Sequence, residues 1–356
     1  MTTARILFLY NAVADAKKRG YFPQLMSCSQ IDVFSEALNN TGHQVVQLNL
    51  RSPEQLRDFV RTNGPFNIAF CIAEGFLDLP AAIADGSGAA WVRRVLADLG
   101  VEATHSAAPT MEVCWYKDRT HQALSRFGLP IPQYCVIRPE LESLKQQLRS
   151  IEREMTFPLF VKPAAGGTSV GISERSLVST PRELGAQVHS LLREFKNPPV
   201  LVETYLRGRE YTVGVMGNRD KLVLPIIAFP LDQKVRTLRT KRNGDKSGQE
   251  KIAAGDPRYR LLSGLAVDVF DAVGAQDVLR IDFKEDGEGK PVVIDVNGSP
   301  ALTPSASLAQ MAAWAGFSYQ QFIELFINIA LERVCGQVDS MKKLESTCDC
   351  GGTDSR

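Results

Sequence analysis

Four polar side chains at one end of a predicted β-hairpin indicate a site for a divalent cation. Residues 278–296 are predicted to form two strands joined by a polar, Gly-rich turn. Side chains alternate along a strand, so Arg280 and Asp282 share one face of the first strand. Asp295 and Asn297 emerge together where the second strand ends. Carboxylate and amide oxygens are ligands that Mg²⁺ prefers, usually together with substrate phosphates. A hairpin with solvated charges is the alternative, but it does not explain why polar residues and Gly-Ser-Pro end an apolar strand.

A lysine followed by a Gly-rich loop is predicted to contact phosphate groups. Lys162 stands next to last in a predicted strand at residues 158–163, and the loop Ala-Ala-Gly-Gly-Thr-Ser-Val-Gly follows this strand at once. The glycines let backbone N–H groups approach an anion, and Thr168 and Ser169 add hydroxyl donors. Because the lysine precedes the glycines, the segment is neither the GxxxxGK[ST] nucleotide loop nor the GxGxxG dinucleotide pattern. For the glycines alone, an ordinary β-turn remains the alternative.

The segment LVETYLRGRE is predicted to be two strands joined by a short polar connection. Such a connection can offer backbone N–H and C=O groups to a purine edge. The Glu203 carboxylate would accept from an exocyclic amine, and Glu210 would accept from ribose hydroxyls. Two surface glutamates flanking a hairpin fit this segment equally well when it is taken alone.

Lys117 and His121 lie four residues apart on one face of a predicted helix at residues 116–127. A solvated lysine and a structural histidine are the ordinary interpretation of such a pair. No Ser/His/Asp order or HExxH pattern gives either residue a stronger role.

Composition describes an ordinary globular protein. The chain has 356 residues, a net charge of +1, 44% hydrophobic and 23% charged residues. This balance gives no reason to expect nucleic acid or an anionic membrane as the main partner. No apolar run approaches the roughly 20 residues that span a bilayer, and the N-terminus does not resemble a signal peptide. Seven scattered cysteines indicate a reducing, cytoplasmic location.

The first hundred residues alternate between predicted strands and helices. Strands are expected at residues 6–10, 43–50 and 67–73, with helices at 53–62 and 89–99. A further helix is expected to start at Ser27-Cys-Ser-Gln30 and to end at Gly42. This order predicts an open parallel α/β sheet. Glu74 follows the third strand, and loops at strand ends are where such sheets bind ligands.

In the rest of the chain, predicted strands and helices alternate less regularly. Strands are expected at residues 134–138, 200–205, 211–216, 278–283 and 291–296, and helices at 141–154, 181–195, 259–273 and 319–334. The polar, cationic stretch 232–258 is predicted to be a loop that acts as a lid. Residues 336–356, which include Cys348 and Cys350, are predicted to be a disordered tail.

Together these segments resemble the ATP-grasp superfamily, and within it the D-alanine–D-alanine ligase group. FPLFVKPAAGGTSVGIS is similar to the group's Val-Lys-Pro segment and phosphate-covering loop. LVETYLRGREYTVGVMGN looks like its adenine and ribose segment, and VLRIDFKEDGEGKPVVIDVNGSPALTPSAS matches its metal and substrate hairpin. The resemblance covers about residues 117–330 well and the N-terminal sheet in outline. It implies an α/β fold, α+β in the ATP-binding half, with three domains at 1–108, 109–205 and 206–335.

The resemblance also implies a role for each matching residue. ATP phosphates would be held by two lysines, Lys117 and Lys162. Thr168 and Ser169 would lie in the closing loop. Adenine would meet Glu203, Tyr205 and Leu206, and Glu210 would bind the ribose.

The remaining matches concern the metal and the reacting groups. Mg²⁺ or Mn²⁺, as two ions, would be bound by Asp282, Asp295 and Asn297. Arg280 would stabilise the acyl-phosphate and the tetrahedral intermediate. Lys241 would reach the terminal phosphates, although the loop also offers Lys246 and Lys251 for this contact.

The amino-acid site departs from the group's pattern. The segment LYNAVADAKKRGYFPQLMSCSQID lacks the Gly-Gly-x-Ser-x-Glu run that grips the first amino acid's ammonium group. IAEGFLDLP replaces an acidic Gly-Glu-Asp-Gly run, Asp295 replaces the usual glutamate, and Ala301 stands where the group has glycine. Substrates are expected near Glu74, Ser299, Ala301 and Ser305.

The implied activity is an ATP-dependent, ADP-forming ligase that joins a carboxylate to an amine through an acyl-phosphate. Its partners would be small molecules, namely amino acids, giving a dipeptide or peptide-like amide in secondary metabolism, and a homodimer is expected. Three alternatives stay open: a true D-alanine–D-alanine ligase, a non-catalytic ATP-binding module, and a Rossmann-type dehydrogenase, which the missing GxGxxG disfavours.

Overall fold

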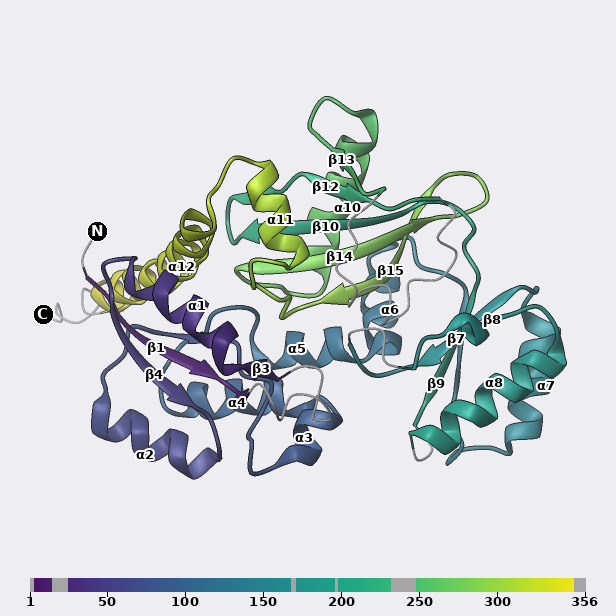
Figure 1. Ribbon diagram of the computed structural model, residues 1–356, viewed down its shortest axis with the longest axis horizontal. Coiled ribbons are helices and arrows are strands. Elements are labelled where there is room, and N and C mark those ends of the chain that lie inside the picture. The colour runs from purple at the N-terminus through teal and green to yellow at the C-terminus, as the bar shows by residue number, and fades with distance from the viewer. Residues whose placement is uncertain (1–2, 15–24, 168–170, 196–197, 232–247, 349–356) are drawn as a thin grey trace, which may run out of the picture.

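The protein has three lobes arranged around a central helix, α5 (Figure 1). A computed structural model describes residues 3–14, 25–167, 171–195, 198–231 and 248–348. Each lobe contains its own β-sheet. Across these residues, none of the helices combines the length and apolar character needed to cross a membrane.

The N-terminal lobe is the predicted parallel α/β sheet. Its strands are β1 (Arg5–Tyr10), β4 (Gln44–Asn49) and β5 (Ile68–Cys71), in the order β4-β1-β5. A short parallel pair, β2 (Ala12–Val13) and β3 (Met26–Ser27), continues from the end of β1. Four helices surround the sheet: α1 (Cys28–Asn39), α2 (Pro53–Asn63), α3 (Pro80–Ala84) and α4 (Ser87–Asp98). Because the three strands are parallel, the loops after β1 and β5 lie at the same edge.

The start of α1 follows from a capping box. The Ser27 side chain accepts from the Gln30 backbone N–H, and the Gln30 side chain accepts from the Ser27 backbone N–H. Two backbone donors at the helix start are thereby satisfied. The predicted helix start at this sequence signal is confirmed.

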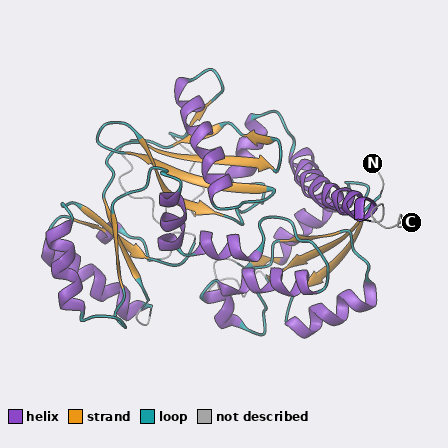
Figure 2. Ribbon diagram, turned by 180° about the vertical axis from the view of Figure 1, so that it is seen from behind, coloured by secondary structure: helices purple, strands orange, loops and turns teal. Residues whose placement is uncertain are grey.

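The second lobe is an antiparallel sheet covered by two helices. Its strands are β6 (Tyr134–Ile137), β7 (Leu159–Pro163), β8 (Leu177–Val178) and β9 (Val200–Thr204), in the order β6-β9-β7-β8. Helices α7 (Leu144–Glu154) and α8 (Pro181–Glu194) both lie on the outer side of this sheet (Figure 2). A short 3₁₀ turn, η2 (Glu174–Ser176), precedes β8.

The C-terminal lobe is built on a larger antiparallel sheet. The order is β13 (Glu250–Ile252), β12 (Ile226–Ala228), β10 (Glu210–Gly217), β14 (Val278–Glu285) and β15 (Pro291–Asn297), and β11 (Lys221–Val223) pairs with β10. Val213 and Val215 on β10 pack with α10 (Pro257–Ala272). The alternate residues Gly214 and Met216 face α11 (Ser307–Trp314) and α12 (Tyr319–Cys348), so helices cover both faces of the sheet.

Two further helices link the lobes. α5 (Ala108–Trp115) and α6 (Lys117–Arg126) both contact β15, and Cys114 and Leu124 belong to the same core as the C-terminal sheet. The chain therefore reaches the C-terminal lobe before it forms the second lobe. The predicted domain 109–205 groups these helices with the second lobe instead. The domain boundaries stay a prediction.

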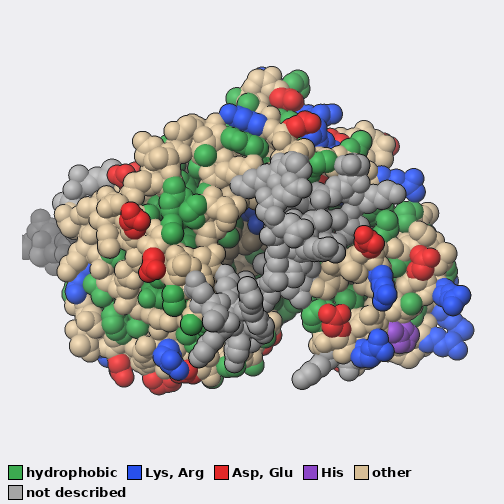
Figure 3. Space-filling view, viewed as in Figure 1, with side chains coloured by type: hydrophobic (Ala, Val, Ile, Leu, Met, Phe, Trp, Pro, Cys, Tyr) green, Lys and Arg blue, Asp and Glu red, His purple; other side chains and the backbone are tan. Residues whose placement is uncertain are grey.

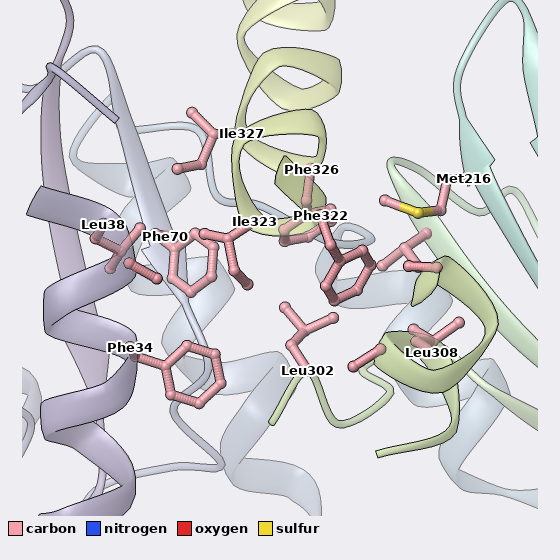
Figure 4. Packing of buried hydrophobic residues seen from close by; sticks show 14 of the residues in the cluster. Phe34, Leu38, Phe70, Met216, Leu302, Leu308, Phe322, Ile323, Phe326 and Ile327 are labelled. Carbon is pink, nitrogen blue, oxygen red and sulfur yellow. The ribbon is translucent and has the colours of Figure 1, made fainter. Parts of the chain in front are cut away.

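Helix α12 fastens the N-terminal lobe to the C-terminal lobe. Phe322, Ile323 and Phe326 pack between Phe70 of β5 and Met216 of β10 (Figure 4). Farther along α12, the Arg333 guanidinium donates hydrogen bonds to both carboxylate oxygens of Asp277, at 2.9 and 3.1 Å. One continuous hydrophobic core thus joins sheets that are distant in the sequence.

Three predicted segments differ from the structure. α12 continues to Cys348, beyond residue 334, since the following stretch contains good helix formers and no proline. The predicted disordered tail is therefore wrong for residues 336–348, and residues 349–356 lie outside the described residues. Of the predicted lid at 232–258, residues 232–247 lie outside the described residues, and the remainder contains β13 and the start of α10 at Pro257. Helices α3, α5 and α11 have no counterpart in the prediction, because they are short and rich in small residues.

Candidate active site

A pocket of about 390 Å³ lies where the N-terminal lobe, α5 and the β14–β15 hairpin meet. Its charged lining residues are Glu74, Lys117, Arg280 and Asp295. Gly166 and Gly167, from the start of the Gly-rich loop, also line it. The face shown in Figure 3 is hollowed near its centre, between the lobes. The pocket therefore gathers residues that the sequence analysis singled out in four separate segments.

The hairpin places its polar groups as predicted. Asp282 and Asp295 are direct partners across β14 and β15, and Arg280 is the partner of Asn297. Asp282 is buried and accepts a hydrogen bond of 2.8 Å from the Thr212 hydroxyl. The Arg280 Nε lies 3.4 Å from an Asp282 carboxylate oxygen. Two carboxylates and one amide are thus held on adjacent strands at one end of the ribbon.

Lys117 connects the hairpin with the Gly-rich loop. Its Nζ donates to Asp295 Oδ1 at 2.7 Å and to the Gly166 carbonyl oxygen at 2.8 Å. Its backbone N–H donates to the Ala164 carbonyl at 2.8 Å. The lysine is therefore a structural junction at the pocket wall and not a solvated surface side chain.

A buried cluster forms where Lys162 meets the second lobe. The Lys162 Nζ lies 2.7 Å from Glu203 Oε2, and His121 Nε2 lies 2.6 Å from Glu203 Oε1. All three residues are less than 5% exposed. Lys162 also donates to the Ile294 carbonyl at 3.2 Å, which joins the second lobe to β15. The sequence predicts Lys162 and Glu203 as ATP contacts, and the structure adds that each is the other's partner.

Electrostatics keeps Glu203 ionised. Burial alone raises the pKa of this carboxyl, but Lys162 and the hydrogen bond from His121 outweigh burial and lower the pKa to about 2. A carboxylate can only accept hydrogen bonds, so His121 Nε2 carries the proton in this contact. Since both Glu203 oxygens are engaged inside the protein, the backbone of the connection after β9 is better placed than this carboxylate to meet a purine.

The connection after β9 has an aromatic wall. The Tyr205 ring lies against Phe160, with ring centroids 6.5 Å apart, and Lys284 Nζ is 5.8 Å from the Tyr205 centroid. Leu206 is buried, and Glu210 begins β10 opposite Lys284 of β14. The predicted adenine and ribose residues therefore lie together beside the end of the hairpin.

The residues predicted to meet the substrates lie close to one another. Glu74, Ser299 and Ala301 all line the pocket. Ser305 lies just beyond it, where its hydroxyl is 3.5 Å from that of the pocket residue Thr303. Of the three candidate loop lysines, Lys241 and Lys246 lie outside the described residues, as do Thr168 and Ser169. Lys251 lies on β13 and donates to the Trp314 carbonyl at 2.7 Å.

Two important residues were missed by sequence reasoning. Asn11, directly after β1, is 2% exposed, and its side chain bonds to the backbone of Leu50, Glu74 and Gly75. Thr212 holds Asp282 from the neighbouring strand. The position of Asn11 after a strand of a parallel sheet was a usable signal, whereas Thr212 becomes visible only once the register of β10 and β14 is known.

The donor set fits a hard cation that shares its ligands with phosphate. In the described part of the chain, no three His, Cys, Asp or Glu side chains gather as a complete metal site. Asp282, Asp295 and the Asn297 amide provide two carboxylates and one neutral oxygen, with the carboxylates facing each other across the ribbon. Mg²⁺ takes few protein ligands and completes its shell with phosphate oxygens and water. These residues therefore fit Mg²⁺ or Mn²⁺ bound together with a nucleotide.

Several known proteins with similar sequences or folds are D-alanine–D-alanine ligases. A family model described as D-ala D-ala ligase C-terminus matches residues 123–328. The D-alanine–D-alanine ligase of Pelotomaculum thermopropionicum is 27% identical over 252 residues, which are 69% of this chain and 76% of that protein. The ligase of Glaesserella parasuis is 30% identical over 237 residues, 66% and 74% of the two chains. A crystal structure of the Bacillus anthracis ligase complexed with ATP has a TM-score of 0.69 and 18% identity, covering 94% of this chain and all of that one.

Proposed function

The chain belongs to the D-alanine–D-alanine ligase family, and from this premise we propose that it is an ATP-dependent, ADP-forming ligase joining a carboxylate to an amine. Its fold is the ATP-grasp fold of those ligases. The observation that carries the proposal is the shared pocket, in which Lys117, Arg280 and Asp295 come together from α6, β14 and β15. The product is a dipeptide or a peptide-like amide.

ATP would lie between the second and C-terminal lobes. Lys117 and Lys162 neutralise phosphate charge from two sides of the site. The backbone of the connection at Tyr205 and Leu206 meets the adenine, and Glu210 accepts from the ribose. Support comes from the contact of Lys162 with Ile294 of β15, which sets this lysine beside the hairpin. Phosphate contacts from Thr168, Ser169 and Lys241 stay predictions.

The metal would be held by the hairpin. Asp282, Asp295 and Asn297 are the residues that would bind Mg²⁺ or Mn²⁺, as two ions shared with the ATP phosphates. When bound, the cations neutralise charge on the phosphoryl oxygens. Thr212 and Arg280 hold the Asp282 carboxylate in place for this role.

The reaction proceeds in two transfers. A substrate carboxylate oxygen attacks the γ-phosphorus of ATP, the bond to the β–γ bridging oxygen breaks, and ADP leaves. The amine then attacks the acyl carbon of the acyl-phosphate, loses a proton, and expels inorganic phosphate. Arg280 lines the pocket and carries a fixed positive charge, so it stabilises the oxyanion that forms during this attack. Water would hydrolyse the acyl-phosphate, and keeping it out is the role predicted for the lid at 232–258.

D-alanine is a specific candidate substrate, because the named relatives are D-alanine–D-alanine ligases. The departures in the N-terminal segments and at Ala301 favour other amino acids. A cytoplasmic location and a homodimer stay predictions.

ADP release tests the proposal. The purified protein is incubated with Mg-ATP and pooled L- and D-amino acids, and separately with D-alanine alone. ADP that forms only with amino acids supports the ligase, and ADP with D-alanine alone supports the cell-wall activity. ATP binding without ADP formation from any mixture would favour a non-catalytic ATP-binding module.

A further inference from the structure

Glu74 is an acidic pocket residue to which the proposed reaction assigns no role. It follows β5 at the edge of the N-terminal sheet and lines the pocket that also contains Arg280 and Asp295. The other charged groups there have partners: Lys117 contacts Asp295, and Arg280 contacts Asp282. In the part of the chain that the structure describes, the Glu74 carboxylate forms no hydrogen bond or ion pair. A carboxylate without a partner at a pocket wall is a ready acceptor for a cationic ligand group.

The backbone around Glu74 is fixed in place. Asn11 Oδ1 accepts from the backbone N–H groups of Glu74 at 2.8 Å and of Gly75 at 3.1 Å. Asn11 Nδ2 donates to the Leu50 carbonyl at 2.9 Å and the Gly75 carbonyl at 3.1 Å. Gly75 has φ +155°, and a Cβ there would meet the Ile83 side chain at 2.8 Å. The carboxylate therefore projects from a rigid turn, so a ligand group can be held there without ordering a flexible loop.

Arg93, whose charge acts on Glu74, does not satisfy this carboxylate. Arg93 is buried and donates to the backbone carbonyls of Ala89 at 3.0 Å and Cys71 at 3.5 Å. Burial raises the pKa of Glu74 to about 7, although the charge of Arg93 opposes the shift. The ionised form of Glu74 is thus poorly stabilised in the free protein. A cation bound beside the carboxylate would stabilise this ionised form.

The surfaces around Glu74 are mostly apolar. Met26 and Ile72 from the N-terminal lobe, Met111 and Trp115 from α5, and Leu302 line the same pocket. The Trp115 ring packs on Gly86, where an added Cβ would lie 1.8 Å from the ring. An apolar side chain of a ligand would remove these surfaces from water, whereas a charged side chain would lose its hydration.

We propose that Glu74 binds the ammonium group of an α-amino acid with an apolar side chain, and so selects a substrate whose amine is free. This inference rests on the proposed ligase function, because it places an amino acid in the same pocket as Arg280. Glu74 is thus a specificity-determining residue. The N-terminal segment of this chain lacks the group's Gly-Gly-x-Ser-x-Glu run. Glu74 supplies the ammonium recognition that this run would otherwise provide.

Binding of defined amino acids tests the inference without relying on turnover. Leucine, methionine and phenylalanine, in both stereochemical forms, and their N-acetyl derivatives are titrated calorimetrically into the full chain saturated with Mg-ADP. Glu74→Gln removes the charge and keeps the size of the side chain. The matched control is Asp78→Asn, a carboxylate on the same loop that is exposed and paired with Arg51.

The expected result separates charge recognition from general damage. A free amino acid binds the wild type and Asp78→Asn equally, its N-acetyl derivative binds neither, and Glu74→Gln weakens binding about ten- to a hundredfold. Affinity for ATP is unchanged in both variants. Equal affinities of Glu74→Gln and wild type, equal binding of the N-acetyl derivative, or no binding of any of these amino acids to the wild type would overturn the inference.

Failure of the ligase function has a different signature. If amino acids bind through Glu74 but no mixture releases ADP, the proposed reaction is wrong and the recognition site stands. If ADP is released with amino acids but Glu74→Gln behaves as the wild type, only the recognition site is wrong.

Discussion

Lys117 at the start of α6 donates a hydrogen bond of 2.7 Å to Asp295 on β15, 178 residues away in the sequence. The same ammonium group donates to Gly166, at the start of the Gly-rich loop. One lysine thus connects the proposed metal-binding hairpin with the loop proposed to cover the phosphates. ATP phosphates that enter between them would find a cation already positioned beside a carboxylate that is proposed to bind the metal.

Lys117→Met should therefore damage the reaction more than the fold. Loss of one positioned charge from the phosphates should lower kcat/KM for ATP about a hundredfold. Steady-state ADP release measures this effect, and Lys145→Met on the exposed face of α7 is the control. Near-normal kinetics of Lys117→Met would remove this lysine from the phosphate site.

Glu203→Gln should destabilise the protein strongly. The substitution leaves the buried Lys162 without a carboxylate partner, and breaking a buried ion pair costs about 3–5 kcal/mol. Urea unfolding measures the free energy, with the exposed Glu152→Gln on α7 as the control, expected within about 0.5 kcal/mol of wild type. Equal stability of the two variants would show that the cluster contributes nothing.

Acid should remove the contribution that ionised Glu203 makes to the stability of the folded protein. The pKa of Glu203 is lowered from 4.5 to about 2 in the folded protein by Lys162 and His121. A depressed carboxyl pKa contributes stability that is present above pH 4.5 and lost as pH falls from 4.5 through about 2. Wild-type stability measured across this window should fall more steeply than that of Glu203→Gln. Parallel curves would contradict the assignment.

Phe326→Ala should loosen the junction of the N-terminal and C-terminal lobes. Phe326 is fully buried and packs edge-on against Phe70 at 5.7 Å between ring centroids. Removing a buried phenylalanine leaves a cavity and costs about 3–5 kcal/mol. Phe127→Ala, at a position 67% exposed, is the control. A small effect of Phe326→Ala would mean that α12 does not hold the lobes together.

Binding of an amino acid at Glu74 should depend on pH near neutrality. Burial raises the pKa of this carboxyl to about 7, and the charge of Arg93 opposes the shift. Burial also raises the pKa of the neighbouring Cys71 thiol, so this group stays neutral. A raised carboxyl pKa means that Glu74 is protonated below about pH 7, so affinity should fall about tenfold per unit below this value. Calorimetry between about pH 6 and pH 8 should show this slope for wild type and none for Glu74→Gln. A flat wild-type profile would contradict the prediction.

The hairpin was predictable because its information is local. Alternation alone placed Arg280 beside Asp282, and the end of the apolar strand marked Asp295 and Asn297. The structure adds the pairing of Asp282 with Asp295, which depends on the register of two strands. The same locality explains the success at Ser27, where cap and helix adjoin in sequence.

The contacts of Glu203 could not be predicted, because His121, Lys162 and Glu203 come from α6, β7 and β9. Each has an ordinary explanation when taken alone, and only their burial together makes them a cluster. Asn11 and Glu74 present the same difficulty, since their hydrogen bonds cross from the end of β1 to the end of β5. Local patterns were therefore enough to propose the reacting groups, whereas the residues that position them became visible only with the fold.

Transfer of oxygen from substrate to phosphate tests the central claim most directly. An amino acid that supports ADP release is labelled with ¹⁸O in its carboxylate and incubated with Mg-ATP and the enzyme. Formation of an acyl-phosphate and its attack by the amine predict that each phosphate released carries one oxygen from the carboxylate. Mass spectrometry of the phosphate should show a single ¹⁸O atom per turnover, and unlabelled phosphate would contradict the acyl-phosphate mechanism.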